Sequence, residues 1–179
     1  MKTAVNTAAG GKRGIGRFLC VQNLFTLLNA AFGLLCTFLS IRGHFSLAVL
    51  CLPLSVVCDY LDGKIGRWLG TPHAFGKELD SLSDVVGFGM APAVFAYAYA
   101  AQEVWLTLVL VIFVLCGILR LARFNVVNLQ SEYIGMPITM NGLMVPLIYW
   151  VMLPTRYYAL VFLLSAGLMI SPLRIKKVS

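Results

Sequence analysis

Charged residues are scarce in this sequence, and acidic residues are the scarcest of them. Only 12% of the 179 residues are charged, seven are Asp or Glu, and 60% are hydrophobic, with a mean hydropathy of +0.87. A chain with so little polar surface is not expected to fold as a soluble domain. The composition instead predicts an all-α polytopic membrane protein. The net charge of +7 then favours anionic lipid over nucleic acid as a binding partner.

The sequence also lacks the patterns of several other protein classes. Its five cysteines are odd in number and follow no Cys-x-x-Cys or Cys/His spacing, which predicts free thiols rather than a disulfide framework or a zinc site. The polar, basic amino terminus does not read as a cleavable signal peptide. Its GKRGIG stretch lacks phosphate-loop spacing and follows no strand, so a basic tail at a lipid surface is the better interpretation.

Domain organisation follows from the same survey. No second domain, low-complexity tract or internal repeat is visible. We therefore expect a basic cytosolic segment over residues 1–17 and one transmembrane domain over residues 18–179.

Long apolar runs predict the membrane spans. A spanning helix needs about 20 apolar residues. By this measure the chain has six candidates, at residues 18–41, 45–69, 77–101, 104–125, 139–154 and 156–173. The fifth run is short and has Pro137, Pro146 and Pro154 within or beside it.

The distribution of basic residues predicts the orientation. With both termini in the cytosol, twelve of the 14 Lys and Arg residues fall in cytosolic segments, and only Arg42 and Arg156 fall in outer loops. This positive-inside bias predicts a protein of the cytoplasmic membrane with its two termini in the cytosol.

The few acidic residues are concentrated in one stretch. Five of the seven acids lie between residues 59 and 84, at the predicted cytosolic ends of the second and third helices. Residues three or four apart share a helix face. One face of the second helix therefore carries Asp59, Asp62, Gly63 and Gly66, and one face of the third carries Gly76, Asp80 and Asp84. Gly70 and Pro72 between them suit a hairpin that brings the two faces together.

This arrangement predicts a metal site. Two carboxylates about 4 Å apart repel by roughly 4 kcal/mol at an effective dielectric of about 20, so four of them need protons or cations. Oxygen ligands suit Mg²⁺, Mn²⁺ or Ca²⁺, and two such ions form a clamp for displacement at phosphorus. The glycines would let a phosphate approach the backbone, and Arg67 could bind it with two hydrogen bonds. Alternatively, the acids could form hydrogen bonds between helices or ion pairs with Lys64, Arg67 and Lys77. That role explains four acids at helical spacing less well than a functional site does.

The same residues resemble a known signature. Asp59-x-x-Asp62-Gly63-x-x-Gly66-Arg67, followed by Gly76-x-x-x-Asp80-x-x-x-Asp84, is similar to the DxxDGxxAR…GxxxDxxxD motif of the CDP-alcohol phosphotransferases. Gly66 stands where that family normally has alanine. The stretches NLFTLLN, SLSDVVGFGMAPA, GILRLARFN and YIGMPITMNG most resemble the phosphatidylserine synthase branch.

The resemblance implies a six-helix, homodimeric membrane enzyme that transfers a phosphatidyl group from CDP-diacylglycerol to L-serine and releases CMP. It assigns the metals to Asp59, Asp62 and Asp80, and makes Asp84 a metal neighbour and the catalytic base. The remaining implied residues are those of the CDP-lipid site: Asn23, Thr26, Gly63, Arg67 and Gly76.

Serine carries a carboxylate and an ammonium group, so its pocket needs a cation and hydrogen-bond acceptors. Arg120 and Arg123 lie three residues apart at the end of the fourth predicted helix, with Asn125 just beyond. Either arginine could hold the serine carboxylate or the lipid phosphate, or could anchor the helix end at the membrane surface. Asn141 could contact substrate or cap the fifth helix.

Other functions remain open at this point. A sister enzyme could use glycerol phosphate or inositol phosphate as acceptor, or an ether-linked donor. A divalent-cation transporter would favour acids at mid-membrane and inverted repeats, which the sequence lacks. A membrane scaffold with a structural cation would not need the interleaved glycines.

Overall fold

The computed structural model describes residues 21–69, 74–100, 103–127, 132–171 and 174–176. The predicted basic segment over residues 1–17 and the Gly70–Pro72 turn lie outside the described residues. In chain order the elements are α1 (Val21–Ile41), α2 (Phe45–Leu69), α3 (Ala74–Asp84), the π-helix η2 (Val85–Met90), α4 (Ala91–Tyr99), α5 (Val104–Val127), β1 (Glu132–Ile134), the 3₁₀ helix η3 (Ile138–Met140), α6 (Asn141–Trp150), the 3₁₀ helix η4 (Thr155–Tyr157), α7 (Tyr158–Ile170) and β2 (Arg174–Lys176).

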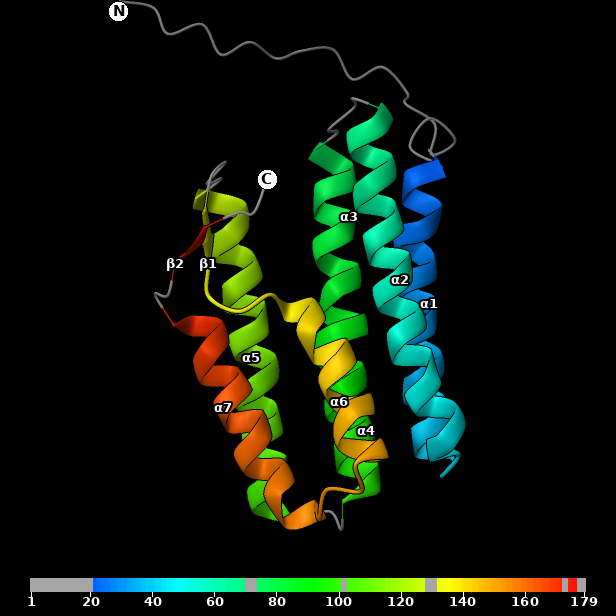
Figure 1. Ribbon diagram of the computed structural model, residues 1–179, viewed down its shortest axis with the longest axis vertical. Coiled ribbons are helices and arrows are strands. Elements are labelled where there is room, and N and C mark those ends of the chain that lie inside the picture. Colours follow the sequence, from blue (N-terminus) through cyan, green and yellow to red (C-terminus); the bar gives the residue numbers. More distant parts are fainter. Residues whose placement is uncertain (1–20, 70–73, 101–102, 128–131, 172–173, 177–179) are drawn as a thin grey trace, which may run out of the picture.

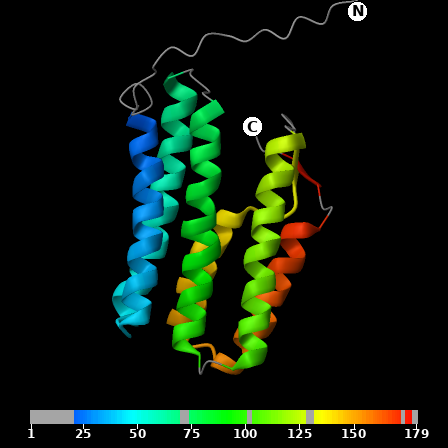
Figure 2. The same ribbon diagram turned by 180° about the vertical axis from the view of Figure 1, so that it is seen from behind.

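The helices run alternately up and down a single bundle. Figures 1 and 2 show the start of α1, the end of α2, the start of α3 and the end of α5 at one end of the molecule. The α1–α2 turn, the end of α4 and the start of α5 lie at the opposite end. Packing is closest between α1 and α2 and between α5 and α7. The acidic residues of α2 and α3 therefore lie toward the same end of the bundle.

Four helices in the described part of the chain are long and apolar enough to cross a membrane: Asn23–Ile41, Phe45–Trp68, Phe75–Tyr99 and Val104–Val126. The protein is an integral membrane protein, and four of the predicted spans are confirmed as helices of spanning length. The buried cysteines Cys36, Cys51, Cys58 and Cys116 are free thiols, as predicted, and the fifth, Cys20, lies outside the described residues.

The last two predicted spans are shorter than expected. Apolar helices cover Ile138–Trp150 and Thr155–Ile170, so six full transmembrane helices are not confirmed. At 1.5 Å per residue the first of them is about 20 Å long, against a hydrocarbon core of about 30 Å. In Figure 1, α6 begins and α7 ends part-way along the bundle.

Short strands follow α5 and α7, in addition to the predicted helices. β1 pairs antiparallel with β2, with Tyr133 opposite Ile175. Gly135 follows β1 with a φ of 75°, and a Cβ there would lie 2.5 Å from the Met169 carbonyl oxygen. A residue with a side chain would therefore push the chain away from the end of α7, where Met136 N–H donates to the Leu168 carbonyl at 3.1 Å.

A π-helix interrupts the third predicted span. The sequence predicted a regular helix over residues 77–101, whereas η2 separates α3 from α4 immediately after Asp84. At η2 the backbone of α1 comes very close, because a Cβ on Gly33 would lie 2.7 Å from the Gly87 Cα. Glycine at both positions therefore fixes how deeply α1 packs against the helix that carries Asp80 and Asp84.

We predict that Gly33→Ala lowers stability by about 1–3 kcal/mol, because the added methyl forces α1 and η2 apart. The thermal unfolding midpoint of the purified protein in detergent measures the effect. Gly89→Ala on the same π-helix is the matched control, since a Cβ there meets no atom within 4 Å. Equal midpoints for the two variants would contradict the close-packing argument.

Candidate active site

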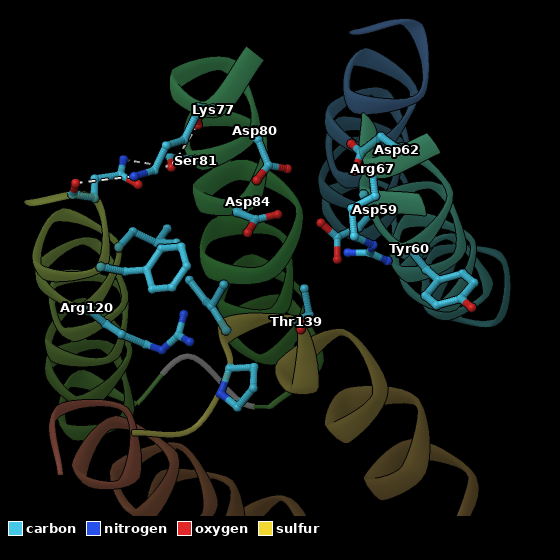
Figure 3. Close-up of a pocket in the computed structure, with 16 residues that line it drawn as sticks. Asp59, Tyr60, Asp62, Arg67, Lys77, Asp80, Ser81, Asp84, Arg120 and Thr139 are labelled. Atoms are coloured by element: carbon cyan, nitrogen blue, oxygen red, sulfur yellow. Dashed lines mark hydrogen bonds between the residues drawn. The ribbon is translucent and has the colours of Figure 1, made fainter. Parts of the chain in front are cut away.

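Three aspartates from two helices bring their carboxylates together. Asp59 and Asp62 of α2 and Asp80 of α3 each offer an oxygen, and these oxygens all lie within 4.8 Å of one another. In Figure 3 the carboxylates of Asp80 and Asp84 point from α3 toward the side on which Asp59 and Asp62 lie. The two acidic helix faces therefore meet, as their spacing predicted.

Asp84 completes the group of acids. It is buried, and its carboxyl lies in hydrogen-bonding contact with that of Asp59. Its Oδ1 atom also accepts a hydrogen bond from the Asn29 side-chain amide at 3.3 Å. We refer to Asp59, Asp62, Asp80 and Asp84 as the carboxylate cluster.

The carboxylate cluster fits a divalent metal ion. Asp62 Oδ2 and Asp80 Oδ1 are buried and have no hydrogen-bond partner among the described residues. Buried oxygens that carry negative charge are costly unless they are paired or coordinate a metal. A set made only of carboxylate oxygens suits a hard cation. The donors present are therefore those that such an ion requires.

A pocket of about 300 Å³ opens beside the carboxylate cluster. Its opposite wall comes from α5 and η3 and includes Arg120, Asn125 and Thr139. Arg120 is only 8% exposed, and Figure 3 shows it across the pocket from the helix that carries Asp59 and Asp62. One cavity thus has an acidic wall that can hold cations and basic groups that can bind an anion.

Comparison with known families agrees with this chemistry. The profile of the CDP-alcohol phosphatidyltransferases matches residues 19–169. The chain belongs to this family.

Curated relatives include enzymes named for serine as a substrate. The chain is 39% identical over 139 residues to the archaetidylserine synthase of Methanothermobacter thermautotrophicus, covering 75% of this chain. It is 42% identical over 130 residues to a CDP-diacylglycerol–serine O-phosphatidyltransferase of Methanocaldococcus jannaschii, covering 73% of this chain. The Helicobacter pylori enzyme of the same name is 36% identical over 143 residues, covering 77%. In each case the matched region spans 60% of the relative's length.

Of the residues predicted for the CDP-lipid site in this CDP-alcohol phosphatidyltransferase, two line the pocket. These are Gly63 and Arg67. Thr26 and Asn23 are buried on α1, and the Thr26 side chain hydrogen-bonds to Asp62, which makes it a support for the carboxylate cluster. Gly76 is buried on α3 outside the pocket wall.

Of the residues predicted for the acceptor site, the structure places some in the pocket wall and others elsewhere. Arg120 and Asn125 line the pocket, whereas Arg123 donates to the Ile170 carbonyl at the end of α7, at 3.4 Å. Asn141 is fully buried; it accepts a hydrogen bond from Ser165 at 2.6 Å, and its amide nitrogen lies 3.5 Å from the Met169 sulfur. Asn141 therefore links α6 to α7, its side chain makes no capping hydrogen bond, and it is not among the residues that line the pocket.

Several pocket residues were not predicted as site residues. Lys77 and Ser81 lie four residues apart on the helix that carries Asp84, so their shared face was a signal in the sequence. Ser81 donates to the Lys77 carbonyl at 3.1 Å and accepts from the Asn125 amide at 2.9 Å, while Lys77 Nζ donates to the Asn125 carbonyl at 3.3 Å. This network ties α3 to α5 across the pocket. Thr139 lines the pocket only because η3 returns to it, and no local pattern indicates that.

We predict that Asp80→Asn weakens Mn²⁺ binding by more than about tenfold, since even indirect contacts to a metal ligand are worth 10–100-fold. Isothermal titration of the purified protein with Mn²⁺ measures this. Glu78→Gln is the matched control, because Glu78 is an exposed acid on the same helix. An unchanged Mn²⁺ affinity in Asp80→Asn would exclude the carboxylate cluster as the metal site.

Proposed function

We propose that this protein transfers a phosphatidyl group from CDP-diacylglycerol to L-serine, forming phosphatidylserine and releasing CMP. The observation that carries the proposal is the carboxylate cluster facing a buried arginine across one pocket. Family membership and relatives named as serine phosphatidyltransferases support it.

The carboxylate cluster would hold two divalent ions, Mg²⁺ or Mn²⁺, with Ca²⁺ as a further candidate. When bound, the ions supply positive charge that neutralises the pyrophosphate of the donor and polarises its phosphorus. Gly63 presents a bare helix backbone to the pocket, and Arg67 lies one turn further along α2. Together they would bind the CDP part of the donor, with Asn23, Thr26 and Gly76 as the further candidates for this site.

The acceptor would enter on the side of Arg120 and Asn125. Arg120 is buried, so a bidentate pair with the serine carboxylate would be little screened by water. Asp84 takes the proton of the serine hydroxyl as that oxygen bonds to the phosphorus carrying diacylglycerol. The bond between this phosphorus and the CMP oxygen breaks, and CMP leaves.

The protein's place in the membrane is part of the same proposal. Twelve of the 14 basic residues belong to segments assigned to one side, which supports a cytoplasmic membrane protein with both termini and the active site on the cytosolic side. CDP and serine would then arrive from water while the acyl chains stay in lipid. Six membrane-crossing segments rest on the six apolar runs of the sequence together with the family resemblance, and a homodimer rests on that resemblance alone.

An ether-linked donor is the second candidate, because one relative is an archaetidylserine synthase. A cation transporter is disfavoured by family membership.

We predict that the purified protein releases CMP from CDP-diacylglycerol with Mn²⁺ or Mg²⁺ when L-serine is the acceptor. Glycerol phosphate, inositol phosphate and inositol serve as alternative acceptors, and a CDP-linked ether lipid serves as the alternative donor. CMP release that is faster with another acceptor would contradict the assignment of serine.

Replacing Asp84 with Asn should lower kcat by about 10²–10⁴-fold, because the substituted amide cannot accept the hydroxyl proton. Steady-state CMP release at saturating metal measures this, with Glu78→Gln as control. Turnover near that of the wild type would rule out Asp84 as the base.

Replacing Arg120 with Lys should raise the KM for serine, because an ammonium group cannot form the two parallel hydrogen bonds of a guanidinium. Arg123→Lys is the matched control on the same helix, since Arg123 contacts the end of α7 instead of the pocket. The same serine KM in both variants would argue against carboxylate binding by Arg120.

A further inference from the structure

Asp84 has a polar contact that lies outside the signature motif. Asn29 of α1 is fully buried, and its side-chain amide nitrogen donates to Asp84 Oδ1 at 3.3 Å. Asn29 lies 55 residues from Asp84 in sequence and does not line the pocket. It therefore contacts Asp84 from outside the set of residues that line the pocket.

A second buried residue fixes which way the Asn29 amide points. The Ser55 hydroxyl on α2 shares its one hydrogen between the Asn29 side-chain oxygen and, at 3.2 Å, the Asn29 backbone carbonyl. A carbonyl oxygen only accepts, so Ser55 is the donor in this pair. With its oxygen held by Ser55, the amide presents its NH₂ group to Asp84.

Close packing keeps this arrangement in place. A Cβ on Gly87 would lie 2.5 Å from Asn29 Oδ1 and 2.8 Å from the Ser55 hydroxyl, so only glycine leaves room for both. Gly87 belongs to η2, the π-helix that begins immediately after Asp84. Such insertions in helices are frequent at functional sites. The π-helix thus brings Asp84 and its two supporting residues together from three helices.

We propose that Asn29, anchored by Ser55, is a positioning residue that holds Asp84 Oδ1 and reserves Oδ2 for the reaction. This inference rests on the proposed function, in which Asp84 is a metal neighbour and the base. Oδ1 of Asp84 accepts the amide hydrogen bond, and Asp84 itself lines the pocket together with Asp59, Asp62 and Asp80.

The test is Asn29→Ala in the 179-residue chain. Electron paramagnetic resonance measures Mn²⁺ binding, and a separate assay measures CMP release. Loss of a group that orients a metal ligand typically costs 10–100-fold in metal affinity or activity. We expect the Mn²⁺ dissociation constant to rise and kcat to fall by that order, with KM for serine unchanged. The number of Mn²⁺ ions bound at saturation should stay the same. A purely structural lesion would instead reduce that number at unchanged affinity.

Ser40→Ala is the matched control, because Ser40 is a buried polar residue of the same helix whose hydrogen bonds to described residues stay within α1. Wild-type Mn²⁺ affinity and kcat in Asn29→Ala would overturn the proposal. If Asn29→Ala does not fold, Ser55→Ala is the deciding variant, because it keeps the Asn29 amide but removes its anchor. Ser55→Ala should weaken Mn²⁺ binding and lower kcat, both by less than is expected of Asn29→Ala. Wild-type Mn²⁺ affinity and kcat in Ser55→Ala would then overturn the proposal. A wild-type protein that binds Mn²⁺ but releases no CMP would refute the proposed function while leaving the metal-binding test of Asn29 intact.

Discussion

The mutual repulsion of four carboxylates confined between two helices is the constraint on which this structure depends. Each pair at about 4 Å costs several kcal/mol even at an effective dielectric of about 20. The surroundings are apolar helices that offer little solvation. The fold must therefore hold α2 and α3 near one another, which it does through α1, since α1 packs against both helices. It must also leave space where cations can offset the charge. The glycine contact between α1 and η2 meets the first need, and the pocket beside the carboxylate cluster meets the second.

The pocket combines groups that are far apart in sequence. Its acidic wall comes from α2 and α3, and its other wall comes from α5 and from η3. The network of Lys77, Ser81 and Asn125 joins these walls. Because opposite charges face one another across a narrow space, a single cavity suits a phosphate-bearing donor, its metal ions and an acceptor with a carboxylate.

The last two apolar helices, α6 and α7, are short, and this shortness helps to form the pocket. A helix α6 that crossed the whole bundle would run past the pocket, whereas the observed α6 is preceded by η3, whose Thr139 and Ile138 line the cavity. The extended segment around Gly135 makes this possible by packing against the end of α7. The departure from six equal spans is thus part of how the pocket is formed.

The sequence alone determined the features that depend on local spacing. The long helices follow from apolar runs, and the acidic faces of Asp59 with Asp62 and of Asp80 with Asp84 follow from the 3.6-residue period. Both are properties of a single helix and need no knowledge of its neighbours. Only the tertiary structure decided which of Arg120 and Arg123 lines the pocket, that Asn141 joins α6 to α7, and that Asn29 and Ser55 lie behind Asp84. Those outcomes depend on the rotation and depth at which helices pack, which are set by contacts such as that between Gly33 and Gly87 and leave no repeat in the sequence.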